Sequence, residues 1–360
     1  MIPVTQPFMP SKKEYEKLLE NLWDTKWLTN NGPYVVELEK ELSERLAVHN
    51  LTYVTNGTLA LQLAIKALDL QGEIITTPFS FIATTTSITW EGCKPVFVDI
   101  DPTTLSIDPE KIETVVTTNT VAIIATHVFG IPCDVERIEA IANKYNLKVI
   151  YDGAHAFGVT YKGRSIFNYG DISTYSFHAT KVFHTVEGGG ITCANKNLAT
   201  KIELLRSYGY VGEDYYLPGI NAKATEFHAA MGICNLNYIE HNLEKRKEIS
   251  EFYNKLLPSD IHVIYITENV EYNYAYYPVL FNSEDTLLKI VSELKSKEIQ
   301  TRRYFYPSLN KLPYLKDNND CPVSESISKR ILCLPLYANL DKKIVKKISD
   351  IINSIIEEES

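Results

Sequence analysis

Apolar and polar positions alternate in a regular way between about residues 50 and 195. Four short runs would present apolar side chains on both faces of a strand. They predict buried strands at residues 73–77, 95–98, 121–126 and 148–151. Helical spacing of apolar residues predicts helices at 58–70, 81–90, 109–116 and 134–145. Such alternation is typical of a mostly parallel sheet covered by helices on both faces, so the sequence predicts a three-layer α/β fold. Ligands of these folds gather at the carboxyl ends of the strands.

The two ends of the chain have a different texture. Residues 12–21 and 35–47 predict two further helices. After about residue 250 come a long amphipathic helix, the aromatic run YNYAYYPVLF, a helix near 284–296 and a terminal helix from residue 343. These patterns predict a large domain at residues 1–245 and a smaller C-terminal α+β domain at residues 246–360.

Composition and charge narrow the class of protein. The 360 residues suffice for one large core and a smaller one, and the net charge of −9 argues against a nucleic-acid or anionic membrane partner. The six cysteines form no Cys-x-x-Cys pair, so we expect reduced thiols and no metal site. The start of the chain lacks the pattern of a signal peptide, and no apolar run approaches the roughly 18 residues of a membrane span. We therefore expect a cytoplasmic enzyme.

Three segments carry candidate chemistry beside the predicted strands. Residues 55–58 (TNGT) precede a helix, where Gly57 and Thr58 could bind a phosphate; for this motif alone, an ordinary N-cap turn is the more common case. Asp152 ends a predicted strand, where a carboxylate could keep a pyridine nitrogen protonated or could cap the next turn. His155 could orient Asp152, lie near a cofactor, or pack in the core.

Lys181 lies between a β-prone stretch and the glycine-rich segment EGGGI. A lysine that attacks an aldehyde must be near neutral, and the apolar and hydroxyl residues around Lys181 suit that requirement. Ser176 could add a phosphate donor. In the segment PFSF at residues 78–81, an aromatic ring could stack on a pyridine ring or pack in the core. Each feature has an ordinary structural alternative, and their combination raises the expectation of a cofactor site.

Taken together, these segments resemble the DegT/StrS-type nucleotide-sugar aminotransferases, which have the aspartate aminotransferase fold of pyridoxal-phosphate enzymes. The resemblance covers nearly the whole chain. It rests on an ordered set of segments: WLTNNGPYVVELEKEL, TNGTLALQLAIKAL, TTPFSFIATTTSITWEGCKPVFVDIDP, THVFGIPCDVERI, YDGAHAFGVTYKGRSI, YSFHATKVFHTVEGGGI, GINAKATEFHAAMG and TRRYFYPSL. It implies that Lys181 holds pyridoxal 5'-phosphate as a Schiff base and moves protons. It also implies that Asp152 pairs with the pyridine nitrogen.

The resemblance implies further roles around the same cofactor. Gly57, Thr58 and Ser176 would bind its phosphate. Phe81 would stack on its ring, with His155 beside the ring. Asn221 would reach the phosphate in the neighbouring subunit, which implies a homodimer with shared active sites. Four residues are candidates for substrate contacts: His127, Lys223, Arg302 and Arg303.

One departure concerns the segment after Asn221, where the family has an aromatic residue and an arginine. This chain has Ala222 and Lys223, and lysine lacks the planar fork of a guanidinium. The substrate contacts at this place therefore stay open. Arg302 or Arg303 could meet a diphosphate, although both could also belong to an ordinary surface.

Within the family, the N-terminal half is most similar to enzymes that aminate carbon 4 of dTDP-4-keto-6-deoxy-D-glucose, which implies L-glutamate as donor and a role in O-antigen or similar glycans. A C3 aminotransferase and a C4 enzyme that makes the axial amine remain alternatives. A sugar dehydratase of this fold needs histidine in place of Lys181. A nucleotide-sugar oxidoreductase should show a glycine-rich dinucleotide turn, which we do not find in a fitting context. A non-catalytic regulator is disfavoured by Asp152 and Lys181 together.

Overall fold

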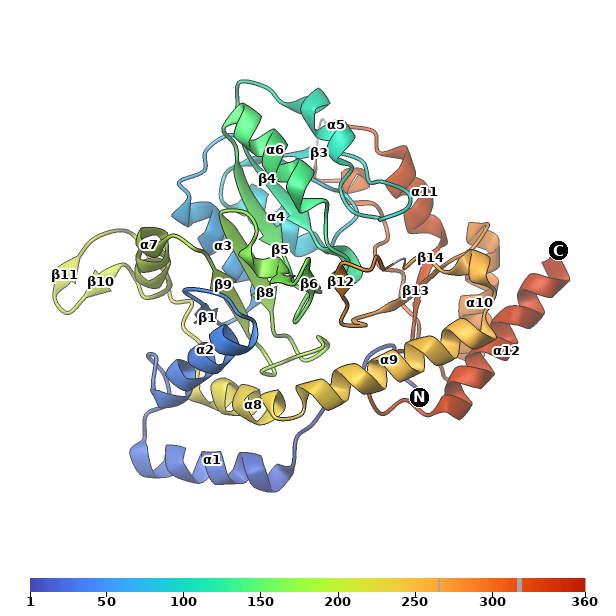
Figure 1. The fold of residues 1–360 in the computed structure, drawn as a ribbon, viewed down its shortest axis with the longest axis horizontal. Helices are drawn as coiled ribbons and strands as arrows, with labels where there is room; N and C mark the ends of the chain where they lie inside the picture. Colours follow the sequence, from blue (N-terminus) through green and yellow to red (C-terminus); the bar gives the residue numbers. More distant parts are fainter. Residues whose placement is uncertain (265, 316–318, 360) are drawn as a thin grey trace.

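The computed structural model describes residues 1–264, 266–315 and 319–359. Among these residues, seven strands form a central sheet in the order β1-β9-β8-β5-β4-β2-β3 (Figure 1). The pairs β3–β2, β2–β4, β4–β5 and β5–β8 are parallel, and β9 is antiparallel to both β8 and β1. The strands are β1 (Thr52–Val54), β2 (Glu73–Thr76), β3 (Lys94–Phe97), β4 (Thr120–Thr126), β5 (Lys148–Asp152), β8 (Ile172–Ser176) and β9 (Gly189–Thr192).

Helices cover both faces of this sheet, as the double-sided apolar runs predict. In β4, Ile123 belongs to the core on one face and its neighbour Ile124 to the core on the other. The face that contains Ile124 is covered by α3 (Gly57–Ala67), α4 (Ile82–Trp90) and α7 (Lys196–Arg206). Helices on the opposite face are α1 (Lys12–Thr25), α2 (Pro33–Arg45), α5 (Pro109–Ile112), α6 (Val135–Tyr145) and α8 (Glu226–Leu236). The predicted α/β fold class is confirmed.

Sequence periodicity places most of these elements, but several features differ or have no prediction, α7 among them. The helix predicted at 109–116 is shorter, because α5 passes into a 3-10 turn at Glu113–Val115. No helix is predicted where α8 forms. Eight of its eleven residues are buried, so its sequence lacks the single apolar stripe of an amphipathic helix. The hairpin of β10 (Tyr210–Val211) and β11 (Asp214–Tyr215) also has no prediction, and it projects from the body beside α7 (Figure 1).

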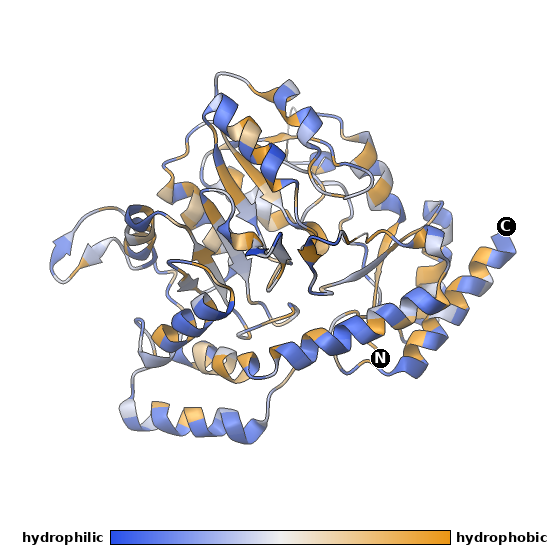
Figure 2. Cartoon of the chain, in the orientation of Figure 1, coloured by the Kyte–Doolittle hydropathy of each residue, from blue (hydrophilic) through white to orange (hydrophobic). Residues whose placement is uncertain are grey.

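The C-terminal part packs on the long helix α9 (Ile239–Leu256), which carries a separate core with α10 (Glu284–Ser296) and α12 (Lys342–Glu359). There β13 (Tyr277–Leu280) pairs antiparallel with β14 (Ile331–Leu334), and α11 (Pro322–Arg330) leads into β14. Both α9 and α12 show alternating hydrophilic and hydrophobic faces (Figure 2). The helices predicted near 284–296 and from residue 343 correspond to α10 and α12, whereas the long helix predicted after about residue 250 begins earlier, at Ile239.

The boundary predicted between residues 245 and 246 falls inside α9, which is one continuous helix. Two links also cross the proposed division. Ile2 forms a bridge with Ile299, and β12 (Val270–Glu271) pairs with β6 (Thr160–Tyr161), which pairs with β7 (Arg164–Ser165). The division into two domains stays a prediction. Within the described ranges, no helix is long and apolar enough to cross a membrane.

Candidate active site

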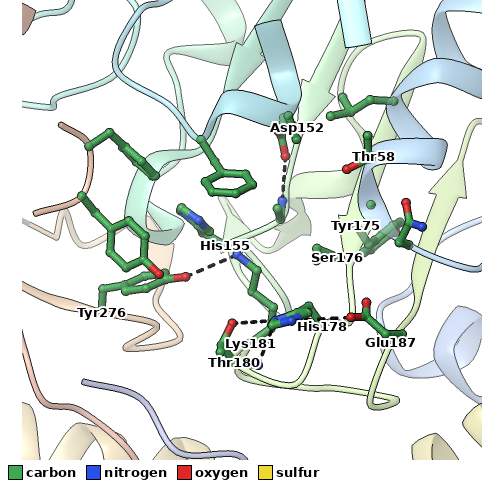
Figure 3. Close-up of a pocket in the computed structure, with 18 of the residues that line it drawn as sticks. Thr58, Asp152, His155, Tyr175, Ser176, His178, Thr180, Lys181, Glu187 and Tyr276 are labelled. Carbon is green, nitrogen blue, oxygen red and sulfur yellow. Dashed lines mark hydrogen bonds and ion pairs between the residues drawn. The ribbon is translucent and has the colours of Figure 1, made fainter. Parts of the chain in front are cut away.

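A cavity of about 240 Å³ opens where strands β5 and β8 end and helix α3 begins (Figure 3). This is the edge of the sheet at which ligands of α/β folds bind. The structure brings eight of the predicted site residues to its lining: Gly57, Thr58, Phe81, Asp152, His155, Ser176, Lys181 and Arg302. Residues far apart in the sequence therefore meet at one site.

Lys181 lies in the loop that follows β8, and its side chain is half-buried in the cavity. Its backbone N–H donates to the carbonyl of His178 (2.8 Å), and its Nζ donates to the hydroxyl of Tyr276 (3.3 Å). Burial lowers the pKa of Lys181 to about 8; the Asp152 carboxylate opposes this shift and Arg302 adds to it. A substantial fraction of the amine is therefore neutral near physiological pH, as a nucleophile requires.

Asp152 is the last residue of β5 and is buried. Its Oδ2 accepts a hydrogen bond from Thr84 Oγ1 (2.6 Å), and its Oδ1 accepts one from the N–H of Ala154 (3.1 Å). These two contacts fix the orientation of the carboxylate. Thr84 comes from α4 and is absent from our sequence prediction; the only signal for it is the run of threonines after a predicted strand.

The start of helix α3 forms a cradle of hydrogen-bond donors. Asn56 caps the helix, because its side chain accepts from the N–H of Leu59 (2.9 Å), so the ordinary N-cap interpretation holds too. The N–H groups of Gly57 and Thr58 belong to the first turn and have no partner inside the helix. The Thr58 side chain is exposed and Ser176 lies nearby at the end of β8 (Figure 3). This set of donors suits a phosphate.

Gly57 is required here for packing against β8. A Cβ at this position would lie 3.0 Å from Ser176 Cβ and 3.1 Å from the carbonyl oxygen of Tyr175. Its role is thus to let the helix N-terminus approach the end of the strand. Its role in binding a phosphate stays a prediction.

The structure separates the two aromatic residues of the segment PFSF. Phe79 is fully buried and packs edge-on against Phe129, whereas Phe81 is 47% exposed and lines the cavity. His155 is buried, and its Nδ1 accepts from the N–H of Phe129 (3.1 Å). Burial, with a further contribution from Lys181, lowers the pKa of His155, so the neutral ring carries its proton on Nε2.

Four other predicted residues lie outside the lining of this cavity. His127 is fully buried and stacked on Tyr151 (ring centroids 4.8 Å apart), and burial lowers its pKa to about 3. Arg303 pairs with Glu284 (2.6 Å). The remaining two lie near the base of the β10–β11 hairpin: Lys223 and Asn221.

Two tyrosines line the cavity from the C-terminal part of the chain: Tyr276, which has no prediction, and Tyr304, from the segment TRRYFY, a candidate for nucleotide and sugar contacts. The Arg302 guanidinium lies 4.5 Å from the centroid of the Tyr304 ring. A sequence signal for Tyr276 exists in the aromatic run YNYAYYPVLF, but periodicity cannot tell which of its tyrosines faces the site. Within the described ranges, no group of three or more His, Cys, Asp or Glu side chains could hold a metal ion.

The donor set of the cavity fits one cofactor in particular. It combines a partly neutral lysine, a carboxylate fixed at a strand end, an exposed aromatic ring and a helix N-terminus with free N–H groups. These are the partners of an aldehyde, a pyridine nitrogen, an aromatic ring and a phosphate, respectively. Fold and site together define a pyridoxal-phosphate-dependent aminotransferase.

Comparison with known proteins places the chain within that class. Residues 10–353 match the profile of the DegT/DnrJ/EryC1/StrS aminotransferase family, and the chain belongs to this family of nucleotide-sugar aminotransferases. It is 43% identical to a dTDP-4-amino-4,6-dideoxy-D-glucose transaminase of Shigella dysenteriae, over 98% of each chain. An Escherichia coli protein of the same name is 39% identical, again over 98% of each chain.

Solved structures agree with the assignment. The structure of DesI in the presence of its TDP-sugar product has a TM-score of 0.92 and 29% identity, covering 98% of this chain and 92% of that one. The pyridoxal-phosphate form of the sugar aminotransferase Spr1654 from Streptococcus pneumoniae has a TM-score of 0.90 and 26% identity, covering 98% and 99%. The prediction of pyridoxal phosphate as the cofactor is confirmed at the level of the family.

Proposed function

We propose that this chain transfers an amino group from L-glutamate to carbon 4 of dTDP-4-keto-6-deoxy-D-glucose. The product would be dTDP-4-amino-4,6-dideoxy-D-glucose, for O-antigen or a similar glycan, made in the cytoplasm. The observation that carries the proposal is the full-length similarity to two transaminases named for this sugar, at 43% and 39% identity. A GDP-perosamine synthase of Escherichia coli O157:H7 is less similar, at 32%.

The residues of the cavity divide the work of the reaction. When bound, pyridoxal phosphate withdraws electrons from the carbon that carries the transferred nitrogen. Lys181 removes a proton from the α-carbon of the donor and, in the second half of the reaction, delivers a proton to the sugar carbon. Asp152, fixed by Thr84, keeps the pyridine nitrogen protonated.

The remaining residues bind and orient the cofactor. Gly57, Thr58 and Ser176 donate hydrogen bonds to its phosphate at the start of α3. Phe81 covers one face of the ring, and neutral His155 lies beside it. We propose that Arg302, which lines the cavity, contacts an anionic group of the substrates. No role in this cavity is proposed for Arg303, which is paired with Glu284.

The lowered pKa of Lys181 predicts how attachment of the cofactor depends on pH. Because the neutral amine is the nucleophile, the rate of pyridoxal phosphate attachment to the cofactor-free protein should rise about tenfold per pH unit below pH 8. It should level off above about pH 8, whereas a lysine with an ordinary pKa continues to about 10.4. Stopped-flow absorbance measures this rate, and N-acetyl-lysine amide is the control. A rate that still rises at pH 10 would contradict the lowered pKa.

Gly57→Ala should weaken binding of pyridoxal phosphate by about three- to tenfold, because the new Cβ pushes the first turn of α3 away from Ser176. Fluorescence titration of the cofactor-free protein measures the dissociation constant. Pyridoxal without its phosphate is the control ligand, and its affinity should hardly change. Equal losses for both ligands would show that the cradle does not bind the phosphate.

We also propose a homodimer with shared active sites, in which Asn221 contacts the cofactor phosphate of the partner subunit. Asn221 is exposed and lies outside the cavity of its own chain. Large aromatic residues that are exposed in a single chain support a second copy as their cover. They occur on α1 and just after it and on the projecting β10–β11 hairpin: Trp23 (67%), Trp27 (51%), Tyr210 (41%) and Tyr215 (80%).

Hybrid dimers test the sharing of sites. In a dimer of one Lys181→Ala subunit and one Asn221→Ala subunit, one site combines an intact Lys181 with the partner's intact asparagine. We therefore expect about half of wild-type activity at a cofactor concentration that leaves the Asn221→Ala homodimer mostly empty. No recovery in the hybrid, with dimers confirmed by light scattering, would contradict shared sites.

The substrate is tested with L-glutamate and a panel of dTDP-, UDP- and GDP-linked keto-sugars, with NMR of the product. We expect the dTDP-4-keto-6-deoxy-D-glucose reaction to be fastest and to give the equatorial 4-amine. An axial amine or a 3-amino product would support one of the alternative aminotransferases. Amination of none of these sugars would overturn the proposed substrate class.

A further inference from the structure

The hydroxyl of Tyr276 is the hydrogen-bond partner of the reactive amine. Lys181 Nζ donates to it over 3.3 Å, as Figure 3 shows, and the Tyr276 side chain is buried. Tyr276 directly precedes β13, in the C-terminal part of the chain, whereas Lys181 follows β8 in the large sheet. We propose that Tyr276 is a positioning residue for the reaction, which holds the Lys181 amine toward the substrate carbon whenever that amine is not bonded to the cofactor.

The backbone before Tyr276 is tied to the large sheet by buried polar contacts. Asn273 is buried; its Nδ2 donates to the carbonyls of His155 (2.8 Å) and Phe157 (2.9 Å), and its Oδ1 accepts from the N–H of Ala275 (3.1 Å). All three amide hydrogen bonds therefore act on segments that adjoin the cavity. They hold the backbone just before Tyr276 against the segment that contains His155.

A buried arginine holds the same segment from the other side. Arg246 of α9 is 4% exposed, and its Nη1 donates to the carbonyl of Ala275 (3.2 Å), with longer contacts to the carbonyls of Tyr274 and Leu336 (both 3.4 Å). None of the ion pairs among the described residues includes Arg246. Burying a cation without an anionic partner is costly, and the three carbonyls offset part of this cost. In return, the guanidinium fixes the position of the backbone next to Tyr276.

The ring of Tyr276 is also confined. It contacts His155 (ring centroids 4.7 Å apart) and meets Tyr304 edge-on (5.4 Å). Burial raises the pKa of Tyr276, so the phenol stays protonated and can act as acceptor or donor toward the amine. A free lysine side chain rotates about four bonds, and a fixed partner at Nζ removes much of that freedom. With Nζ donating to the phenol, the lone pair of the neutral amine is left available for the substrate proton.

Tyr276→Phe tests this role, with Tyr277→Phe as the matched control. The hydroxyl of Tyr277 donates to Asn254 (2.7 Å) and does not line the cavity. The assay is the half-reaction with L-glutamate in single turnover, run with hydrogen and with deuterium at the α-carbon. For Tyr276→Phe we expect a rate about 10- to 100-fold lower and a larger isotope effect, because proton transfer by a misplaced amine becomes rate-limiting. Tyr277→Phe should match the wild type in both measurements.

A second measurement separates positioning of Lys181 from a general defect of the cavity. Pyridoxamine phosphate forms no bond with Lys181, so its affinity for Tyr276→Phe should be unchanged, while pyridoxal phosphate should attach more slowly. A wild-type isotope effect and rate, or an equal loss of pyridoxamine phosphate affinity, would overturn the inference. The assay rests on the proposed donor, and a wild-type protein that does not react with L-glutamate would contradict that proposal instead.

Discussion

Lys181→Ala is expected to lower the rate of amino transfer by at least about 10⁴-fold. General acid–base catalysis by a positioned side chain contributes typically 10²- to 10⁴-fold, and this variant also loses the covalent attachment of the cofactor. The lysine is half-buried in the cavity with its pKa lowered to about 8, which suits both tasks. Single-turnover reaction with L-glutamate measures the rate, and the visible absorbance of the lysine-bound cofactor should disappear with it.

Two controls make this result specific. Lys181→Arg keeps a positive charge but is not a nucleophile at neutral pH, so it should be as inactive as Lys181→Ala. Borohydride reduction of the wild-type holoenzyme, followed by peptide mass spectrometry, should locate the cofactor on the peptide that contains Lys181. Turnover by the purified alanine variant, or labelling of a different lysine, would contradict the assignment of Lys181 as the lysine that binds the cofactor.

Asp152→Asn should lower the rate by about 10²- to 10⁴-fold while the protein stays folded. Removing one charge of a buried pair typically costs about 3–5 kcal/mol, and each 1.36 kcal/mol corresponds to a factor of ten. Asparagine has nearly the same shape and can keep the contact to the N–H of Ala154, but it cannot hold a pyridine nitrogen protonated. Half-reaction kinetics measure the loss, and thermal unfolding confirms that the fold is intact.

Thr84→Val separates the charge of Asp152 from its orientation. This variant removes the 2.6 Å hydrogen bond to Oδ2 and leaves the carboxylate in place, so its loss of rate should be well below that of Asp152→Asn. A cofactor analogue with a permanent positive charge on the ring nitrogen should restore more of the lost activity in Asp152→Asn than in Thr84→Val. Equal rates for Asp152→Asn and wild type would show that the carboxylate does not contact the ring nitrogen.

The pattern of apolar and polar residues within a single segment predicts most of the central strands and several helices. Runs of residues apolar on both sides mark the central strands, and the strand predicted at 121–126 corresponds to β4 (Thr120–Thr126). The helix predicted near 284–296 corresponds to α10 (Glu284–Ser296), because capping at Ser283 and an apolar stripe both occur within the segment. Helix α8 lacks such a pattern because tertiary contacts bury most of its surface.

The sequence by itself determined the class of fold, through its periodicity, and it identified Lys181 and Asp152 as candidates, whose roles the resemblance to the family implies. Only the tertiary structure decided which aromatic residue of PFSF faces the cavity, that Arg302 lines it while Arg303 pairs with Glu284, and that Tyr276 contacts Lys181. The reason is physical. These choices depend on contacts between separate segments, 19 residues apart for Arg303 and Glu284 and 95 for Lys181 and Tyr276. Neighbouring residues of the same type are indistinguishable until those segments pack together.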